Sequence, residues 1–390
     1  MTRRIAVVGA TGSIGSGALQ IIAQHPGRFR ASVLAAHRNV EALAVLCTRH
    51  RPVLAIIADK TLEAALARRL AAAGVRCEVA GGAEAIAQAV ASGACDDVIA
   101  ASSGIAGIAP ALAAARAGKR LLLANTESMV TAGVLLRQAL IQGGGQLIPL
   151  DGRQHAIFRC LSSCRPVQAD GLTLTLVGSG GVFRGCSRAQ LMTAGPEHIG
   201  PSPPYPGKAL DRVNAASLMD LGLGLIQAHH LFAVPADRLR VMLQADGQVR
   251  GIVERPGSEA PIQIGQLDPR QSVGAALAWP ERIDQAQSPP EPLQATPAAF
   301  EKPDVKTFRC PSLALQALRA GGDAGTILNA ANEVAVTAFL AGSLPFLSIA
   351  DLIEQALMEL PPQPVVDIQT LSERDRTARE AVRRVLRNAC

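Results

Sequence analysis

Three glycines near the amino terminus have the spacing of a dinucleotide-binding turn. Gly9, Gly12 and Gly15 directly follow the apolar run at residues 5–8. A buried strand that leads into such a turn and then a helix lets the backbone approach a pyrophosphate, and it directs helix N–H groups at that anion. The sequence therefore predicts a dinucleotide site, and a tight strand-to-helix turn without a ligand is the alternative. The predicted contacts are Gly9, Thr11, Gly12, Ser13, Ile14 and Gly15.

The residues after the second apolar run indicate which dinucleotide binds. Residues 37–39 are His-Arg-Asn, at the place where an NAD site usually has Asp or Glu for the ribose hydroxyls. A cation and an amide suit a 2′-phosphate, so Arg38 and Asn39 favour NADP(H). A solvated loop arginine with no ligand is the alternative for Arg38.

A parallel sheet is needed to bring these residues together. Between Ile5 and Leu150, short apolar runs alternate with helical segments that are rich in Ala and Leu. This alternation is typical of parallel strands joined by crossover helices. The predicted fold class is α/β, with an N-terminal Rossmann-like parallel sheet. The runs lie at 5–8, 32–36, 53–58, 75–79, 98–101, 121–124 and 147–150.

The pattern changes after Asp151 and predicts three further parts. Strand-like runs at 172–177, 239–243, 249–253 and 262–264 surround one helical segment over about 210–232, which indicates a central α/β domain. Six prolines between 280 and 303 predict an extended linker, and helical spacing returns from 312. We therefore predict an NADP-binding domain at 1–150, a central catalytic-type domain at 151–280 with a lid near 195–208, a linker at 281–311 and a C-terminal helical domain at 312–390.

Composition excludes several other classes of protein. The 390 residues carry 38 basic and 32 acidic side chains. The arginines of residues 374–387 alternate with acidic residues and have no aromatic neighbours, which predicts a solvated helix face and no nucleic-acid partner. Eight scattered cysteines without a CxxC pair predict reduced thiols in the cytoplasm. The uncharged stretch 98–115 contains Pro110 and many small residues, so no membrane partner is expected.

Several longer motifs resemble one enzyme family. The chain is similar to 1-deoxy-D-xylulose 5-phosphate reductoisomerases, the NADPH- and divalent-metal-dependent enzymes of non-mevalonate isoprenoid biosynthesis. The resemblance implies a homodimer, a small-molecule substrate, Asn125 as a further cofactor-binding residue and Glu127 as a site residue. The matching stretches are GATGSIG at 9–15, LLANTES at 122–128, Asp151 with AIF at 156–158, GSGGVFR at 178–184, AWP at 278–280 and LNAANE at 328–333.

The resemblance implies a metal site that this sequence alters. The family binds its ion with three carboxylates, and only Asp151 remains here, since Arg153 and Gly224 stand at the other two positions. Mg²⁺ and Mn²⁺ need hard, anionic oxygen ligands. We therefore expect metal binding to be weakened or lost, with Arg153 paired to Asp151. Asp220, one helical turn before Gly224, is the alternative ligand.

The implied phosphate pocket is altered in the same direction. Ser179 is retained, but Ala215, Asp220 and Leu221 stand where the family has Ser, Asn and Lys. A cation is lost and an anion is gained, which disfavours a phosphorylated sugar. The family has another Lys just before the Glu-Ser of its site, and Thr126 stands there in this chain. The His and Trp of the family's lid align with Ser202 and Tyr205, respectively.

Three functions remain open from the sequence. The first is an NADP-dependent oxidoreductase with altered substrate and metal dependence, in which Arg153 replaces the metal as electrophile and Lys208 helps to bind a carboxylate. The second is the family's own reaction, which forms 2-C-methyl-D-erythritol 4-phosphate. The third is a silent nucleotide- or partner-binding homologue. The predicted catalytic residues are Asp151, Arg153, Glu127, Ser179 and, as an acid or base, His155.

Overall fold

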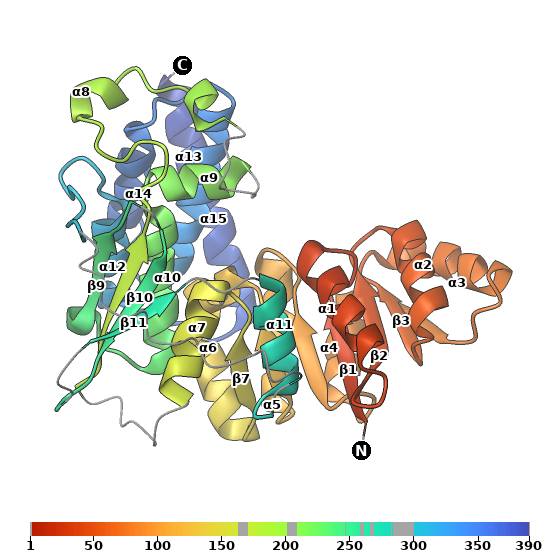
Figure 1. Cartoon of the computed structure of the whole chain (residues 1–390). Helices are drawn as coiled ribbons and strands as arrows, with labels where there is room; N and C mark the ends of the chain where they lie inside the picture. The colour runs from red at the N-terminus through yellow and green to blue at the C-terminus, as the bar shows by residue number, and fades with distance from the viewer. Residues whose placement is uncertain are drawn as a thin grey trace. The chain divides into compact units, whose positions relative to one another are not determined.

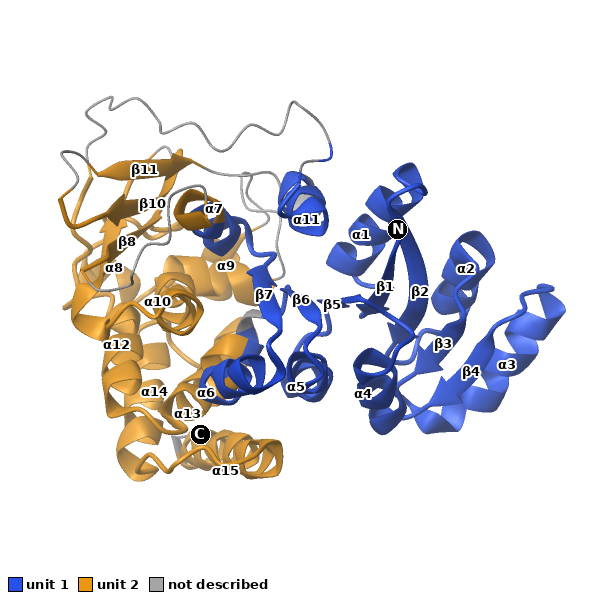
Figure 2. Ribbon diagram, turned by 90° about the horizontal axis from the view of Figure 1, so that it is seen from below, with its two compact units in different colours: residues 1–128, 133–158, 267–288 blue, residues 129–132, 159–266, 289–390 orange. Residues whose placement is uncertain are grey.

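The computed structural model describes residues 2–162, 171–200, 209–245, 247–257, 261–265, 269–281, 283 and 300–389. Ser202, Tyr205 and Lys208, with the second half of the predicted lid and most of the proline-rich linker, lie outside the described residues. The chain divides by packing into two compact units, and each consists of three segments (Figure 2). Unit 1 comprises Met1–Ser128, Gly133–Phe158 and Leu267–Ser288; unit 2 comprises Met129–Ala132, Arg159–Gln266 and Pro289–Cys390. The four consecutive domains stay a prediction.

Unit 1 contains a seven-stranded parallel sheet, which confirms the predicted α/β fold (Figure 1). The strand order is β4-β3-β2-β1-β5-β6-β7, so the direction of winding reverses between β1 and β5. Ligands of such sheets bind at the carboxyl ends of the strands beside this switch point. The strands are β1 (Arg3–Val8), β2 (Phe29–Ala36), β3 (Leu54–Ile57), β4 (Glu78–Gly81), β5 (Asp97–Ala100), β6 (Arg120–Leu123) and β7 (Gln146–Pro149).

Helices enclose this sheet and explain its apolar strands. Residues 5–8 are almost fully buried, as expected for a parallel strand that is covered on both faces. The helices of unit 1 are α1 (Ser13–Gln24), α2 (Val40–His50), α3 (Glu63–Ala72), α4 (Ala83–Ala91), α5 (Ile108–Arg116), most of α6 (Thr126–Gly143), the first part of α7 (Gly152–Ser162), and α11 (Pro269–Ala278). Short 3-10 helices lie at Lys60–Leu62 and Ile105–Gly107.

Helix α11 packs with unit 1, although its residues fall within the range predicted for the central domain. It lies against α1 (Figure 2). At its carboxyl end, Arg120 Nη2 donates to Leu277 O over 2.8 Å, while Arg120 Nε donates to Asp97 Oδ1 over 2.9 Å. A buried ion pair between β5 and β6 therefore binds a segment more than 150 residues away. Apolar periodicity, which is local, does not reveal such a contact.

Unit 2 contains a smaller mixed sheet and a broken helix. Its order is β11-β10-β8-β9, with β8 parallel to β9 and antiparallel to β10. The strands are β8 (Thr173–Gly178), β9 (Leu239–Leu243), β10 (Val249–Glu254) and β11 (Ile262–Gly265). The single helix predicted over 210–232 is instead α9 (Ala209–Ala216) and α10 (Met219–Phe232), because buried Leu218 between them is left-handed with φ 62°. The short helix α8 (Arg188–Leu191) precedes them.

Four helices form the predicted C-terminal helical part: α12 (Cys310–Ala320), α13 (Ala324–Leu340), α14 (Ser348–Glu359) and α15 (Ile368–Ala389). The motif at 328–333 lies inside α13, where Asn329 Nδ2 donates to Glu333 Oε1 over 3.0 Å. Arg379 of α15 donates to Glu333 Oε2 over 2.7 Å, and Arg374 pairs with buried Asp323. The motif therefore connects helices, and two of the arginines expected on a solvated face contribute to the fold.

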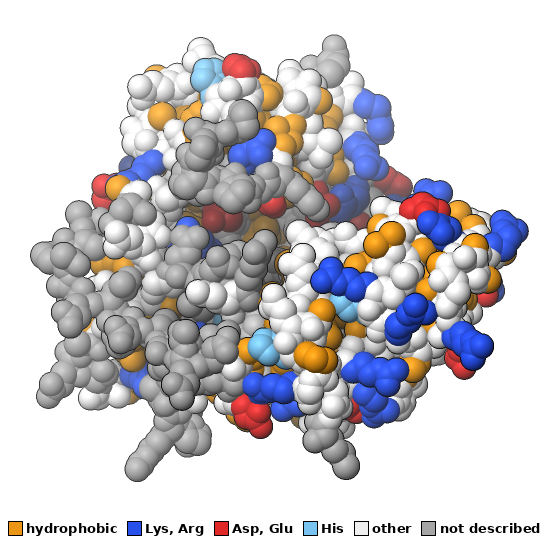
Figure 3. Space-filling view, turned by 45° about the vertical axis from the view of Figure 1, so that its right-hand side comes forward, with side chains coloured by type: hydrophobic (Ala, Val, Ile, Leu, Met, Phe, Trp, Pro, Cys, Tyr) orange, Lys and Arg blue, Asp and Glu red, His pale blue; other side chains and the backbone are white. Residues whose placement is uncertain are grey.

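On the face drawn in Figure 3, basic side chains are dispersed and some acidic side chains lie among them. Among the helices of the described part, none is both long and apolar enough to cross a membrane.

Three buried cysteines give a prediction for alkaline conditions. Burial raises the pKa of Cys47 and of Cys310 to about 12, and that of Cys95 to about 11, from an ordinary value of 9.0. Between pH 9 and 12 the unfolded chain loses these thiol protons while the folded chain keeps them, so the free energy of unfolding should fall as pH rises. Urea denaturation at pH 8 and pH 10 measures this fall.

The same burial should set the order in which the thiols react. In folded protein at pH 8, a thiol reagent should label half-buried Cys186 before these three cysteines, as measured by peptide mapping. Equal labelling of all four would contradict the prediction.

Candidate functional site

The glycine turn lies at the carboxyl end of β1, beside the switch point to β5. Gly9 has φ +87°, and a Cβ there would lie 2.6 Å from Ala101 O. A Cβ on Gly15 would lie 2.3 Å from Gly9 O. In both cases the neighbour is a backbone oxygen, and the distance is shorter than real Cβ atoms show. A side chain at either position would therefore displace the turn. The turn thus brings β1, the start of α1 and the loop after β5 into contact.

The start of α1 presents backbone donors to solvent. Gly12 is the N-cap and provides no side-chain hydrogen bond, and both Gly12 and Ser13 are exposed. The first N–H groups of a helix have no acceptor within it, and the helix dipole adds positive potential there. The six residues predicted to contact a dinucleotide therefore lie together at one edge of the sheet, where an anion would meet backbone donors.

Arg38 lies at the end of the neighbouring strand β2. Its side chain is 69% exposed, and its Nε lies 3.1 Å from Asp59 Oδ2. Hydrogen bonds from Thr61, together with Arg38, hold the pKa of Asp59 below its ordinary value. Asn39 Oδ1 accepts from Ala42 N over 2.9 Å and caps α2. Arg38 is thus available for an anion, while the Asn39 side chain has a structural role. Asp59 was missed from the sequence, where only its place after the third apolar run marks it.

Asn125 and Glu127 lie at the start of α6, and their side chains contact the loop after β5. The structure therefore places both predicted residues at the same edge of the sheet as the glycine turn. Their contacts in that loop are Ser102 and Gly104, which the sequence did not single out.

Asp151 begins α7 as its N-cap. Its exposed carboxylate Oδ1 accepts from Arg153 N over 3.1 Å and from Gln154 N over 3.0 Å. His155 is only 1% exposed, and its Nδ1 lies 2.9 Å from Pro149 O, so this nitrogen is the protonated one. Asp151 is thus exposed, Arg153 is half-buried with a buried Nε, and the His155 ring is inside unit 1. The ion pair between Asp151 and Arg153 stays a prediction.

In unit 2 the structure brings together three positions of the implied phosphate pocket. Ser179 follows β8, and its Oγ accepts from Gly181 N over 3.4 Å. A Cβ on Gly178 would lie 2.8 Å from Leu221 Cδ1, and one on Gly181 would lie 2.8 Å from Ala215 O. Leu221 is fully buried, whereas the neighbouring Asp220 is half-buried. An apolar side chain therefore packs under the loop that carries Ser179.

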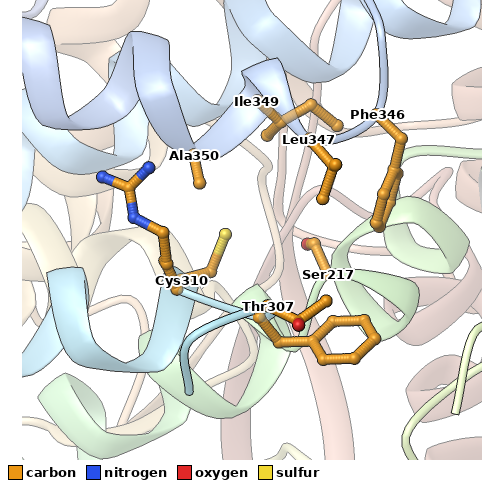
Figure 4. Close-up of a pocket in the computed structure, with 9 residues that line it drawn as sticks. Ser217, Thr307, Cys310, Phe346, Leu347, Ile349 and Ala350 are labelled. Carbon is orange, nitrogen blue, oxygen red and sulfur yellow. The ribbon is translucent and has the colours of Figure 1, made fainter. Parts of the chain in front are cut away.

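A small cavity in the helical part of unit 2 does not extend this site. Its volume is about 10 Å³, which is room for about one water molecule. Ser217 and Cys310 point into it, and Phe346, Leu347 and Ile349, from α14 and the residues just before it, are among the apolar side chains that line it (Figure 4). In the described part of the chain, no group of three or more His, Cys, Asp or Glu residues is placed to bind a metal ion.

Comparisons with protein-family models cover most of the chain. The model described as 1-deoxy-D-xylulose 5-phosphate reductoisomerase matches residues 5–133. The model described as the 1-deoxy-D-xylulose 5-phosphate reductoisomerase C-terminal domain matches residues 147–232, and the one described as the DXP reductoisomerase C-terminal domain matches 264–381.

Individual relatives agree with these matches. The 1-deoxy-D-xylulose 5-phosphate reductoisomerase of Xanthomonas campestris pv. campestris (strain 8004) is 45% identical over 384 residues, covering 98% of this chain and 97% of that protein. The solved reductoisomerase from Zymomonas mobilis in complex with NADPH is 34% identical with a TM-score of 0.88, covering 99% of each chain. A solved DOX-P reductoisomerase in complex with NADPH, fosmidomycin and magnesium is 33% identical with a TM-score of 0.84, covering 99% of this chain and 98% of that one.

Proposed function

Because this chain belongs to the 1-deoxy-D-xylulose 5-phosphate reductoisomerase family, we propose that it is an NADP(H)-dependent oxidoreductase of isoprenoid biosynthesis. The observation that carries the proposal is the glycine turn at the β1–β5 switch point, with Arg38 one strand away. The turn would bind the pyrophosphate through backbone N–H groups, and the Arg38 guanidinium would bind the 2′-phosphate. The proposal includes a homodimer in the cytoplasm, and light scattering of the purified chain would test the dimer.

The comparisons favour 1-deoxy-D-xylulose 5-phosphate as the substrate. Identity of 45% extends over nearly the whole chain, and the similar solved structures align end to end. They therefore support the family's own reaction better than the altered substrate and metal dependence that the substitutions predict. When bound, NADPH would supply the hydride for that reaction, and Ser179 would be one of the residues that bind the substrate.

The residues at Asp151 do not fit a divalent ion as the family's site does. Magnesium is present in a similar solved structure, so the expected weakening of metal binding has no support from the comparisons. In this chain, however, Asp151 Oδ1 already accepts two backbone N–H groups, and a cation follows two residues later. A hard cation needs several anionic oxygens and is repelled by a guanidinium. The reaction proposed for this chain therefore relies on its own residues and not on a metal.

Specific residues favour a second candidate, reduction of a different carbonyl substrate. Buried Leu221 packs against Gly178 where the family resemblance implies a lysine, and Asp220 adds negative charge beside it. A phosphate dianion would meet fewer donors there. Arg153 would stabilise the oxyanion that forms during hydride transfer, and a carboxylate would suit the site better than a phosphate. The burial of His155 supports a structural role for that residue.

NADPH oxidation with 1-deoxy-D-xylulose 5-phosphate, with and without Mg²⁺ or Mn²⁺, separates the candidates. The family's reaction would be supported if wild type shows metal-dependent turnover of this substrate and if the Arg153→Gln variant changes that turnover less than threefold. The second candidate would be supported if wild type does not turn over this substrate but does oxidise NADPH with a keto acid or a different keto sugar. It would also be supported if wild type is inactive with this substrate and the double variant Arg153→Glu with Leu221→Lys gains that activity. Arg188→Glu, on exposed α8, is the matched charge control.

Cofactor binding is measured separately by calorimetry. We expect wild type to bind NADPH more tightly than NADH, and Arg38→Ala to weaken NADPH about tenfold while NADH changes less than twofold. Tighter binding of NADH by wild type would contradict the assignment of NADP(H). Tight NADPH binding without turnover of any substrate would favour the silent homologue.

A further inference from the structure

Two cysteines of unit 1 that are far apart in sequence lie beside each other. Cys47 is near the end of α2 and is fully buried, whereas Cys77 directly precedes β4 and is half-buried. Cys47 belongs to the apolar core around the larger sheet, and Cys77 packs against that core. Their side chains share a hydrogen bond, which the Cys47 thiol donates to Cys77 Sγ. Two nucleophilic sulfur atoms are therefore in contact within one compact unit.

Hydrogen bonds on both sides of the two thiols hold these segments together. Arg51 N donates to Cys47 O over 2.9 Å at the end of α2, and Arg51 Nη1 donates to Gly74 O over 3.1 Å. Glu78 N donates to Val53 O over 2.9 Å. The chain is thus bound to the end of α2 and the residues after it at two points, three residues before the second cysteine and one residue after it.

The second cysteine is directly before a strand at the edge of the sheet. Strand β4 has four residues, and β3 is its neighbour, with Leu54 opposite Glu78 in parallel register (Figure 2). An edge strand has a sheet neighbour on one side only, so it opens more readily than an inner strand. A covalent bond from the residue before β4 to helix α2 would restrain this opening.

We propose that Cys47 and Cys77 are a redox modification site and form a reversible disulfide bond that connects α2 to the edge strand β4. The sulfur atoms of a disulfide are about 2 Å apart. Two thiols that already share a hydrogen bond reach this separation by a small rotation of their side chains. The inference is independent of the proposed reaction, because neither cysteine is assigned to the cofactor or to the substrate.

A hydroperoxide is the class of oxidant that the proposal requires, and hydrogen peroxide is the simplest example. The half-buried Cys77 meets it first: its thiolate attacks one peroxide oxygen, the O–O bond breaks, and the hydroxide that leaves takes up a proton to form water. The Cys47 sulfur then attacks the sulfenic acid on Cys77, the S–O bond breaks, and the departing hydroxide takes the Cys47 proton. The two thiols lose two electrons, and the peroxide is reduced to two water molecules.

The surroundings of the two thiols predict a slow reaction. Burial raises the pKa of Cys77 above its ordinary value, although the hydrogen bond from Cys47 acts in the opposite direction. Burial also raises the pKa of Cys47, to about 12. Since the thiolate is the form that reacts, we expect this site to respond to sustained exposure to an oxidant and not to act as a rapid catalytic thiol. A dithiol reductant would reverse the bond by exchange.

Peptide mapping of the full chain after incubation with hydrogen peroxide at pH 8 tests the proposal. Cleavage after arginine and glutamate separates Cys77 from Cys95, because Glu78 and Glu84 lie between them. We expect a linked pair of peptides that contain Cys47 and Cys77, lighter by two hydrogens than the separate peptides and separated again by dithiothreitol. Hydrogen exchange should show the amides of β4 exchanging about tenfold more slowly in the oxidised protein. An unchanged exchange rate in the linked protein would overturn the restraint on the edge strand.

Variants of single cysteines test the order of the two steps. In Cys47→Ala the second thiol is missing, so dimedone should trap a sulfenic acid on Cys77. In Cys77→Ser the linked peptides should disappear and Cys47 should stay a thiol. Cys186→Ala is the matched control, because Cys186 is also half-buried, and it should form the linked peptides to the same extent as wild type.

The proposal would be overturned if folded wild type gives no linked peptides with hydrogen peroxide or with diamide, a second thiol oxidant. It would also be overturned if Cys77 links to other cysteines as often as to Cys47. Should Cys47→Ala not fold, as judged by its thermal transition, Cys77→Ser decides the order, and oxidation of Cys47 in that variant at the wild-type rate would contradict it.

Discussion

Replacing Gly15 with alanine is expected to weaken NADPH binding at least a hundredfold and to lower the free energy of unfolding by about 2–3 kcal/mol. The new methyl group would lie 2.3 Å from Gly9 O and 2.9 Å from Ala10 Cα. Because both neighbours are backbone atoms, rotation of a side chain cannot relieve the overlap. The turn itself must shift, and with it the N–H groups at the start of α1. Calorimetry and urea denaturation measure the two effects.

Gly17 provides the control within the same helix. Nothing lies within 4 Å of a Cβ placed there, and the residue is inside α1. Alanine is favoured over glycine in a helix interior, so Gly17→Ala should raise the free energy of unfolding by roughly 0.5–1 kcal/mol and leave NADPH binding unchanged. Similar losses in the two variants would show that the overlap at Gly15 is not the cause.

The second large effect is expected for Arg120→Met, which should lower the free energy of unfolding of unit 1 by about 3 kcal/mol. The variant leaves Asp97, whose side chain is 4% exposed, without its main partner. It also removes the donors to the backbone carbonyls of Leu277 and Trp279. Arg3 lies 4.0 Å from Asp97 and compensates in part, which places the expected loss at the lower end of the range for a broken buried pair.

An exposed pair in the same part of unit 1 gives the comparison. Arg4 and Asp96 are 49% and 42% exposed, so Arg4→Met should cost less than about 1 kcal/mol. Adding Asp97→Asn to Arg120→Met should recover part of the loss, because it removes the unpaired buried charge. Urea denaturation of the four proteins checks this order, and equal losses in the Arg4 and Arg120 variants would exclude it.

Much of the fold was predictable because it depends on local pattern. The run at 5–8 is apolar throughout since β1 is covered on both faces, and it identifies a parallel strand. The break at Leu218 was missed because its left-handed backbone has no Gly or Asn to mark it. The placement of α11 was missed because it depends on Arg120, which is distant in sequence.

The candidate site was predictable to a similar extent. The glycine turn and Arg38 have types and spacings that a single stretch of sequence reveals, and the structure places them at one edge of the sheet. The contacts of Asn125 and Glu127 depend on a loop about twenty residues earlier, so only their proximity to the site could be expected. Substitutions such as Leu221 indicate altered chemistry locally, whereas similarity over the whole chain favours the family's reaction.

The division of each unit into three segments limits how this protein can be taken apart. A gene fragment that ends near residue 158 would encode all seven strands of the larger sheet but not α11. It would expose the apolar surface that α11 covers and leave the Arg120 guanidinium without its distant acceptors. Neither half can therefore be produced by one truncation, and a minimal cofactor-binding fragment would require residues 267–288 to be joined back by an engineered connection.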